Sequence, residues 1–291
     1  MIGTSTRSEI KRPKTFEEQV EILRARNLRI DDEERAREVL SRINYYRLSA
    51  YALSHQTGDL FHDGVSFKDI YNLYEFDKKF RSILMERLES IEIAMRTQVA
   101  YTIAHKYGAL GYREADNFHN SSFHAQNLQE WDKQLERSDE VFVKHHEVKY
   151  GAFPVWVAIE VTTFGLLSRI YSNLKKDARA AIARMYYGVS DKYLASWLHA
   201  LSTLRNICAH FGRTYNRPLV IKPKMYGSDI KKGIKNDSIF AALILMGRLT
   251  RSWGGWSSFV SNIEALVGQY DFVNLDLMGF PEDWYALLSN P

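Results

Sequence analysis

Apolar residues recur at intervals of three and four along most of the chain, the spacing that places them on one face of a helix. The longest series predicts a helix over residues 66–106, as one element or as two with a short break, stopped by Gly108. The apolar positions of this series are Ile70, Leu73, Tyr74, Phe80, Leu84, Leu88, Ile91, Met95, Val99 and Ile103.

Capping signals predict where the other helices begin and end. Thr15 and Glu18 have the spacing of a capping box, and Asp31–Glu34 repeats that form. Further helices are predicted over residues 126–148, 154–174, a short stretch up to 187, 190–209, 237–252, 256–268 and 281–289, with a loop at 109–125. The β-branched cluster 161–163 lies within helical periodicity, so we predict no sheet. The expected fold class is all-α.

Composition narrows the class of protein. The chain has 291 residues, enough for one large domain or two of ordinary size, and its 45% hydrophobic content is typical of a globular protein. With a single cysteine, Cys208, an intrachain disulfide is impossible. No apolar run is long enough to span a membrane, and residues 1–14 lack the apolar segment of a signal peptide. We therefore expect a cytoplasmic protein without a membrane partner.

The net charge of +4 is unevenly distributed along the sequence. Residues 201–235 contain eight Lys or Arg against one acid, Asp229, so this window carries +7 and the rest of the chain −3. Its basic residues are Arg205, Arg213, Arg217, Lys222, Lys224, Lys231, Lys232 and Lys235. A local basic segment favours a phosphate-bearing partner. The alternative is a solvated connection over 218–235 that lysine keeps soluble.

The predicted helix that ends near Ala209 carries the most informative residues. Arg205 follows Leu201 by four residues, so it falls on the apolar stripe of that helix, where a guanidinium needs an anionic or polar partner. A polar ridge runs beside this stripe through His199, Ser202, Asn206 and His210. The end of the helix therefore presents an arginine, an amide and an imidazole together.

These groups suit cleavage of RNA by attack of the 2′-hydroxyl on its own phosphorus. Histidine is the side chain best suited to general acid or base catalysis near neutral pH, and His210 supplies one here. Arg205 can bind two phosphate oxygens and offset the developing charge, and Asn206 can orient the histidine or bind the sugar-phosphate. This chemistry requires no metal and no cofactor.

The spacing of arginine and histidine alone decides nothing. Two pairs occur, Arg205 with His210 and Arg113 with His119, about the number expected by chance. The first pair has an adjacent asparagine and a basic segment after it. The second spans a predicted loop and has neither, so we treat it as the chance pair.

Several strings of the sequence resemble the AbiD/AbiF-type abortive-infection family, bacterial phage-resistance proteins related to the HEPN superfamily. The strongest is the string from Arg205 to Arg217, which contains Arg205-Asn206-x-x-x-His210. The supporting strings are Ile43–Tyr51, Phe76-Asp77, Glu89–Arg96, Pro154–Trp156 and Phe164-Gly165. Together they cover about residues 12–219 in the expected order.

The resemblance implies a HEPN-like helical bundle with extra N-terminal and C-terminal helices. It divides the chain into residues 1–55, a core at 56–219 and an extension at 220–291. In ribonuclease members, two copies join their motifs in one composite, metal-independent site, which implies a homodimer and catalytic roles for Arg205, Asn206 and His210. We expect RNA contacts from Arg213, Tyr215, Asn216 and Arg217, with Tyr215 stacking on a base.

The sequence leaves a second class of function open. The same basic segment serves a non-catalytic module that binds RNA or a partner and is controlled by a cognate small RNA or antitoxin. Among the other candidates, adjacent histidines 145 and 146 point about 100° apart on a helix, which disfavours a shared metal ion. Cys208 lies on the apolar stripe, which favours a buried thiol over a nucleophile. Glu92 and Arg96 form either a surface pair or an interior pair that orients the motif helix.

Overall fold

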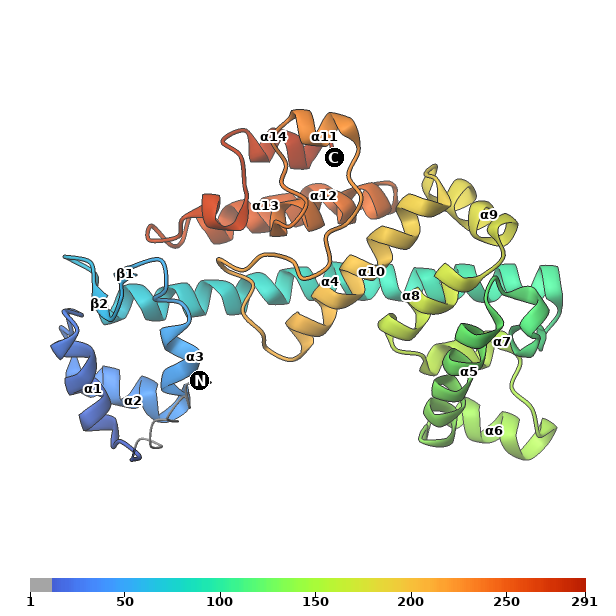
Figure 1. The fold of residues 1–291 in the computed structure, drawn as a ribbon, viewed down its shortest axis with the longest axis horizontal. Coiled ribbons are helices and arrows are strands. Elements are labelled where there is room, and N and C mark those ends of the chain that lie inside the picture. Colours follow the sequence, from blue (N-terminus) through green and yellow to red (C-terminus); the bar gives the residue numbers. More distant parts are fainter. Residues whose placement is uncertain (1–11) are drawn as a thin grey trace, which may run out of the picture. The chain divides into compact units, whose positions relative to one another are not determined.

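The computed structural model describes residues 12–291, whose regular structure is almost entirely helical (Figure 1). The first helices are α1 (Phe16–Ala25), α2 (Glu33–Arg42), α3 (Tyr45–Ser49), α4 (Phe67–Tyr107), α5 (Ser121–Glu136), α6 (Val141–Tyr150) and α7 (Val155–Ala158). The others are α8 (Phe164–Asn173), α9 (Lys176–Tyr187), α10 (Asp191–Ala209), α11 (Gly227–Lys231), α12 (Ile239–Thr250), α13 (Trp256–Val267) and α14 (Trp284–Ser289). The all-α prediction is confirmed. The expected lack of a signal peptide concerns residues that mostly lie outside the described part of the chain.

One small β-hairpin departs from the prediction that there is no sheet. Strands β1 (Gln56–Thr57) and β2 (Leu60–Phe61) are two residues each and pair in antiparallel register. Gly58, with a φ of 61°, stands in the turn between them, a conformation that favours glycine. Strands this short are too brief for an alternating pattern to reveal them in the sequence.

Contacts divide the chain into two compact units, Met1–Phe76 and Asp77–Pro291. The predicted division into an N-terminal helical subdomain (1–55), a core that carries the motif (56–219) and a C-terminal extension (220–291) stays a prediction. In the first unit, the capping box of α1 is confirmed, since Thr15 and Glu18 bond each other's backbone N–H groups. Asp32, rather than Asp31, caps α2 by accepting from the Arg35 N–H. The second predicted box was therefore wrong by one residue.

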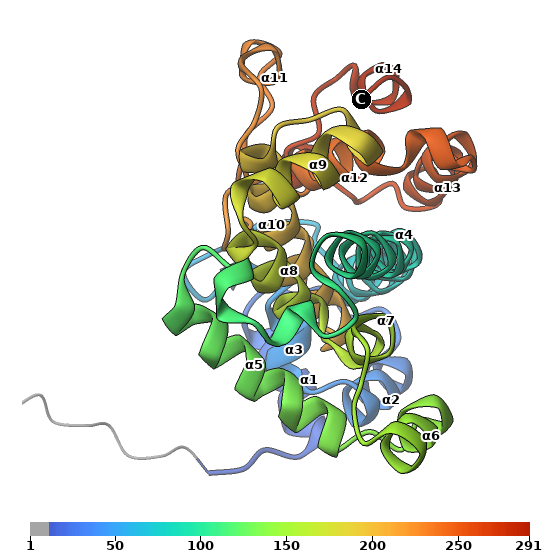
Figure 2. The ribbon, with the colours of Figure 1, turned by 90° about the vertical axis from the view of Figure 1, so that its right-hand side faces the viewer.

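Helix α4 is a single element of 41 residues, so the sequence series has no break. No glycine or proline occurs between its ends, and its apolar stripe is completely buried at Leu84, Leu88, Ile91, Met95 and Val99. Other helices of the second unit surround the part of α4 that belongs to that unit. Figure 2 looks along α4 and shows α12 and α13 above it, α8 and α10 beside it and α7 below.

Two predicted helices are interrupted. The stretch predicted at 126–148 is α5 and α6, separated by residues 137–140. The stretch predicted from Pro154 to Leu174 is α7, a short 3-10 turn and then α8. Thr162 donates its hydroxyl to the Ile159 carbonyl, and Thr163 accepts from the Leu166 N–H as the cap of α8. These hydroxyls compete with helical hydrogen bonds, so the β-branched cluster ends one helix and begins the next.

The remaining predicted helices are present. Helix α9 ends at Gly188, whose φ of 64° forms its left-handed C-cap, and α10 covers the expected range. All residues of helix α12 except Arg248 are buried in the second unit, and nearly all of them are apolar. The basic connection contains the short helix α11, which begins at Gly227 and ends at Lys231.

Candidate active site

Helix α10 carries the predicted motif on its last turns. Its apolar side, including Leu201, Leu204 and Cys208, is buried, whereas Asn206 and His210 are exposed. Because these two residues are four apart, they lie on the same face of the helix. The expected polar ridge is only partly present: Ser202 is buried, and its hydroxyl donates to the His199 carbonyl at 3.0 Å.

Arg205 has the anionic partner that its place on the apolar stripe requires. Its Nε lies 3.1 Å from a carboxylate oxygen of Glu92 on α4. The Glu92 side chain is 5% exposed, whereas that of Arg205 is 30% exposed. A buried carboxylate therefore holds an arginine that still reaches the surface.

Glu92 binds a second arginine at the same time. Arg96 donates to the other Glu92 oxygen at 2.6 Å and to the Thr162 carbonyl at 2.7 Å. Burial raises the pKa of Glu92, and the positive charges of Arg96 and Arg205 oppose that rise. The network joins α4, α10 and the connection before α8, so the interior alternative for Glu92 and Arg96 is the correct one.

The chain leaves α10 through a Schellman motif, a pair of backbone hydrogen bonds that closes the end of a helix. The Gly212 N–H donates to the Ile207 carbonyl at 2.7 Å, and the Phe211 N–H donates to the Cys208 carbonyl at 3.0 Å. Phe211 takes the left-handed position with a φ of 57°, where glycine is more usual. His210 stands at the C-cap, so this turn fixes the backbone beside its imidazole.

Asp77 fastens the loop that follows this turn. Its buried carboxylate accepts from the N–H groups of Thr214 and Tyr215 at 3.1 and 2.9 Å. The Thr214 hydroxyl and the Arg81 guanidinium also donate to it. The sequence drew attention to Asp77 through the resemblance but gave it no role. The structure shows that it ties the motif loop to α4.

The four residues predicted to bind RNA lie in this loop and differ in their burial and in their hydrogen-bond partners. Arg213 donates to the carbonyls of Tyr215 and Asn216 at 2.7 and 2.9 Å, so its guanidinium orders the loop. The Arg217 guanidinium lies 3.5 Å from the Arg213 carbonyl oxygen, and both Arg217 and Asn216 are half-buried. Tyr215 is completely buried, and its hydroxyl accepts from the Asn274 N–H. The expectation that Tyr215 stacks on a base is therefore wrong in this structure, since neither ring face is accessible.

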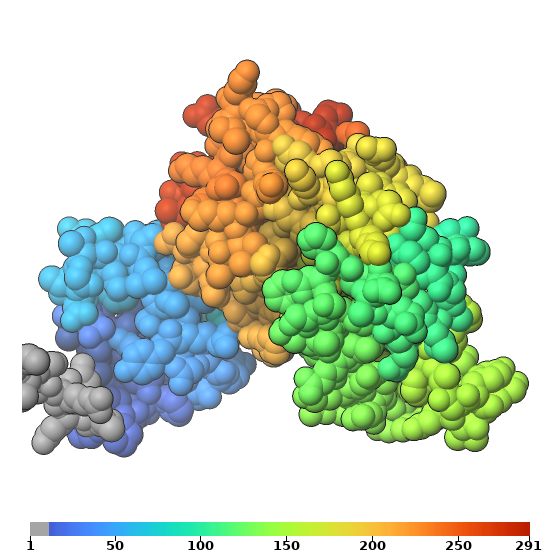
Figure 3. Space-filling model, turned by 45° about the vertical axis from the view of Figure 1, so that its right-hand side comes forward, coloured from blue at the N-terminus to red at the C-terminus, as the bar shows by residue number. Residues whose placement is uncertain are grey.

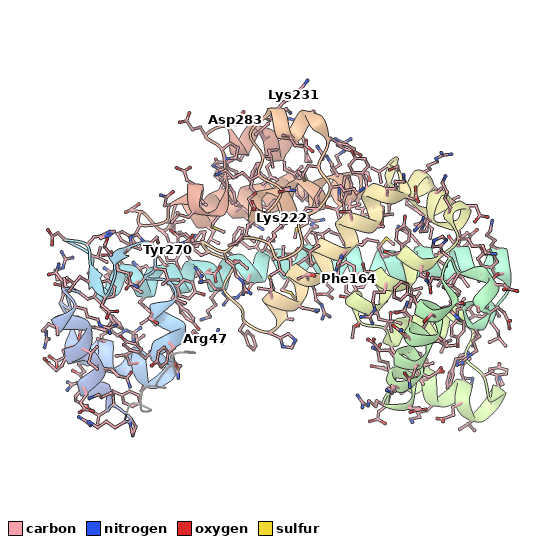
Figure 4. All side chains as sticks on the ribbon, in the orientation of Figure 1. Arg47, Phe164, Lys222, Lys231, Tyr270 and Asp283 are labelled. Atoms are coloured by element: carbon pink, nitrogen blue, oxygen red, sulfur yellow. The ribbon has the colours of Figure 1, made fainter. Side chains whose placement is uncertain are left out.

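The lysines of the basic segment reach the surface, which is expected both for a segment that meets phosphate and for a solvated connection. All five, Lys222, Lys224, Lys231, Lys232 and Lys235, are exposed. The orange segment in Figure 3 contains them, and Figure 4 shows Lys231 pointing away from α11. Asp229, the one acid of this window, is buried and binds Arg248 through both oxygens, at 2.7 and 2.6 Å. It does not neutralise a lysine.

The surroundings of Cys208 and His146 favour structural roles over a nucleophile or a metal ligand. Cys208 is buried, and burial raises the pKa of its thiol to about 12, which does not favour a nucleophilic thiolate. The His146 Nδ1 lies 2.8 Å from the carbonyl of Phe142, one turn earlier on α6. Within residues 12–291, no three His, Cys, Asp or Glu side chains gather as metal ligands. No helix in that range is both long and apolar enough to cross a membrane.

Residues 38–216 match the family described as Abi-like protein, and the chain belongs to this family. The matched range includes Glu92, Arg96 and the whole motif of α10, and it ends just after the loop that Asp77 fastens. This membership connects the chain with abortive infection, a form of phage defence, in agreement with the resemblance noted above. No curated protein matches the chain, and no solved structure matches it.

Proposed function

We propose that this protein is a metal-independent endoribonuclease of the HEPN type that acts in the bacterial cytoplasm during abortive infection. The observation that carries the proposal is that one helix holds both Arg205, which is paired with buried Glu92, and the exposed imidazole of His210. A guanidinium held in this way is preorganised, so it need not reorient when negative charge develops on a phosphate.

Arg205 keeps donors available for such a phosphate. Its Nε is used by Glu92 at 3.1 Å, while its side chain remains 30% exposed. A guanidinium has five N–H donors, and a fork of two is enough to bind two phosphate oxygens. Arg205 therefore stabilises the pentacoordinate phosphorane, and Glu92 is the positioning residue behind it.

His210 supplies the proton transfers. Its exposed imidazole accepts a proton from the 2′-hydroxyl or donates one to the departing 5′-oxygen, which leaves a 2′,3′-cyclic phosphate on one product. Exposed Asn206 lies one turn earlier on the same face, where its amide can orient the imidazole or bind the sugar-phosphate. The reaction forms a bond between the 2′-oxygen and phosphorus and breaks the bond from phosphorus to the 5′-oxygen. One proton leaves the 2′-hydroxyl and one is added to the 5′-oxygen, so no redox partner is needed.

The geometry of α10 favours a site built from two copies of the chain. Arg205 and His210 are five residues apart, so their directions around the helix axis differ by about 140°. One copy therefore does not direct both groups at one phosphate from the same face. A symmetric homodimer brings the Arg205 of one copy toward the His210 of the other, and the exposed lysines after α10 attract the RNA backbone.

The test is cleavage of single-stranded RNA by the purified full chain in the presence of EDTA. We expect products from the wild type, and a loss of at least about a hundredfold in rate for His210→Ala and for Arg205→Ala. His145→Ala is the matched control, because His145 is exposed on α6 away from the motif. Cleavage that survives both motif substitutions, or that EDTA abolishes, contradicts the proposed mechanism.

A second function is favoured by one observation, the five exposed lysines between residues 222 and 235. They suffice for a module that binds RNA, or a cognate small RNA, without cleaving it. For such a module, the logarithm of the RNA-binding constant falls linearly with the logarithm of the salt concentration. The His210→Ala substitution leaves its affinity for RNA unchanged. Binding of this kind together with intact RNA under every condition would select this second function.

A further inference from the structure

A cavity of about 710 Å³ lies among α5, α8 and α10 in the second unit. It falls within the size range of pockets that hold small organic ligands. On the face shown in Figure 3, the green residues of α5 lie beside the yellow residues of α8 to α10. His199 of α10 contributes to its lining, so the cavity shares a helix with the candidate active site.

Two buried polar side chains line this cavity with hydrogen-bonding groups that the protein leaves unused. Ser168 is 3% exposed, and its hydroxyl forms no hydrogen bond within the described residues. Asn127 is 8% exposed; its amide oxygen accepts from Arg169, whereas its amide nitrogen donates to no group among residues 12–291. Both groups reach the open side of the cavity, so they are available to a ligand with its own donors and acceptors.

The rest of the lining points to a planar, uncharged ligand. Phe123 is 58% exposed at the cavity and can stack on a ring. Arg169 is paired with Glu130, so this ion pair adds no net charge to the lining. An aromatic face beside amide and hydroxyl groups is the chemistry that recognises an unpaired nucleobase through its face and its edges.

Lysines without an ion pair in the described part of the chain lie next to the cavity. His119 lines both this cavity and a neighbouring hollow that also contains Lys175 and Lys176. Both lysines are exposed and form no ion pair within the described chain, while the adjacent Asp177 is neutralised by Lys106 at 2.6 Å. A neutral cavity with positive charge at its side matches a base whose backbone phosphate remains at the surface.

We propose that this cavity binds one nucleobase of a single-stranded RNA and that it selects which RNA the protein engages. The inference rests on the proposed function for its substrate class. His199 lies eleven residues before His210, which is about 16 Å along α10 by the helical rise. A short stretch of single strand spans that distance, so the cavity reads a base a few nucleotides from the phosphate at His210.

The test measures binding by the full-length His210→Ala protein, in which cleavage does not interfere. Short fluorescent RNAs of one base type are titrated at fixed salt, with and without Phe123→Ala. The loss of one stacked base predicts about tenfold weaker binding of at least one of these RNAs. Phe142→Ala is the matched control, because Phe142 is an exposed phenylalanine on α6 outside this cavity.

Asn127→Leu provides a second variant that occupies the cavity, with circular dichroism to verify its fold. Equal affinities for Phe123→Ala and Phe142→Ala would overturn the inference. A free mononucleotide that binds as tightly as the RNA and also requires Phe123 would overturn the assignment to an RNA strand. RNA that binds through Phe123 but is never cleaved refutes only the nuclease proposal. Cleavage whose base preference ignores Phe123 refutes only this inference.

Discussion

Replacing Glu92 with glutamine tests whether the buried carboxylate holds both arginines. Glu92 accepts a hydrogen bond from Arg96 at 2.6 Å and forms an ion pair with the Arg205 Nε at 3.1 Å, and its side chain is 5% exposed. A glutamine keeps the shape and one acceptor oxygen, but its amide nitrogen faces the second guanidinium. One of these two charged contacts is lost, which costs about 1.5–3 kcal/mol, and alanine, which removes both contacts, costs about 3–5 kcal/mol.

The assay is urea denaturation followed by circular dichroism, with Glu89→Gln as the matched control. Glu89 is one turn earlier on α4, is exposed and forms no ion pair among the described residues, so its loss is expected to cost less than about 0.5 kcal/mol. A Glu92→Gln protein as stable as Glu89→Gln would refute the network. We also expect Glu92→Gln to slow RNA cleavage while binding persists, because Arg205 loses its orientation.

Two further predictions concern the surroundings of the motif, and a third concerns a close approach between Gly279 and Ser238. The pKa of Cys208 is raised to about 12, so at pH 8 its thiolate fraction is about a thousandfold below that of an ordinary cysteine. Iodoacetamide should therefore label Cys208 only after the protein unfolds. Rapid labelling of the native protein would contradict the burial of this thiol. Asp77→Asn is expected to lower the free energy that fixes the loop after α10 by about 3 kcal/mol, because the buried carboxylate loses its charge. Trypsin should then cut that loop faster than in the wild type. An unchanged rate of proteolysis would contradict this role of Asp77. A Cβ at Gly279 would lie 2.3 Å from the Cβ of Ser238. Gly233 has the same φ of 78° but open space around it, so Gly279→Ala should destabilise the protein by about 1–3 kcal/mol more than Gly233→Ala. Equal denaturation midpoints for the two variants would contradict the clash.

The parts of the fold that the sequence predicted depend on local rules. Helix α10 and the buried stripe of α4 follow from apolar spacing, and the ends of α1 and α9 follow from Thr15 and Gly188, which act within a few residues. The break at Thr162 and Thr163 was missed because each hydroxyl competes with the helix only when the surrounding packing permits it. Periodicity alone does not contain that information.

The partners of the motif could not be predicted in the same way. The requirement for an anion near Arg205 followed from its place on the apolar stripe, but Glu92 stands on another helix and no spacing connects the two. Tyr215 was misjudged because the resemblance identifies an aromatic residue at this position but does not show whether its ring is buried. Asp77 in fact draws the backbone at Tyr215 toward α4, and the ring becomes buried. Long-range contacts decide such orientations.

The most direct test of the central claim is the chemistry of the RNA ends that the purified protein produces in EDTA. Mass spectrometry of a defined single-stranded RNA should show 2′,3′-cyclic phosphate and 5′-hydroxyl ends with the wild type, and intact RNA with His210→Ala. Ends that carry a 5′-phosphate, or cyclic-phosphate products that persist at the same rate in His210→Ala, would contradict the account.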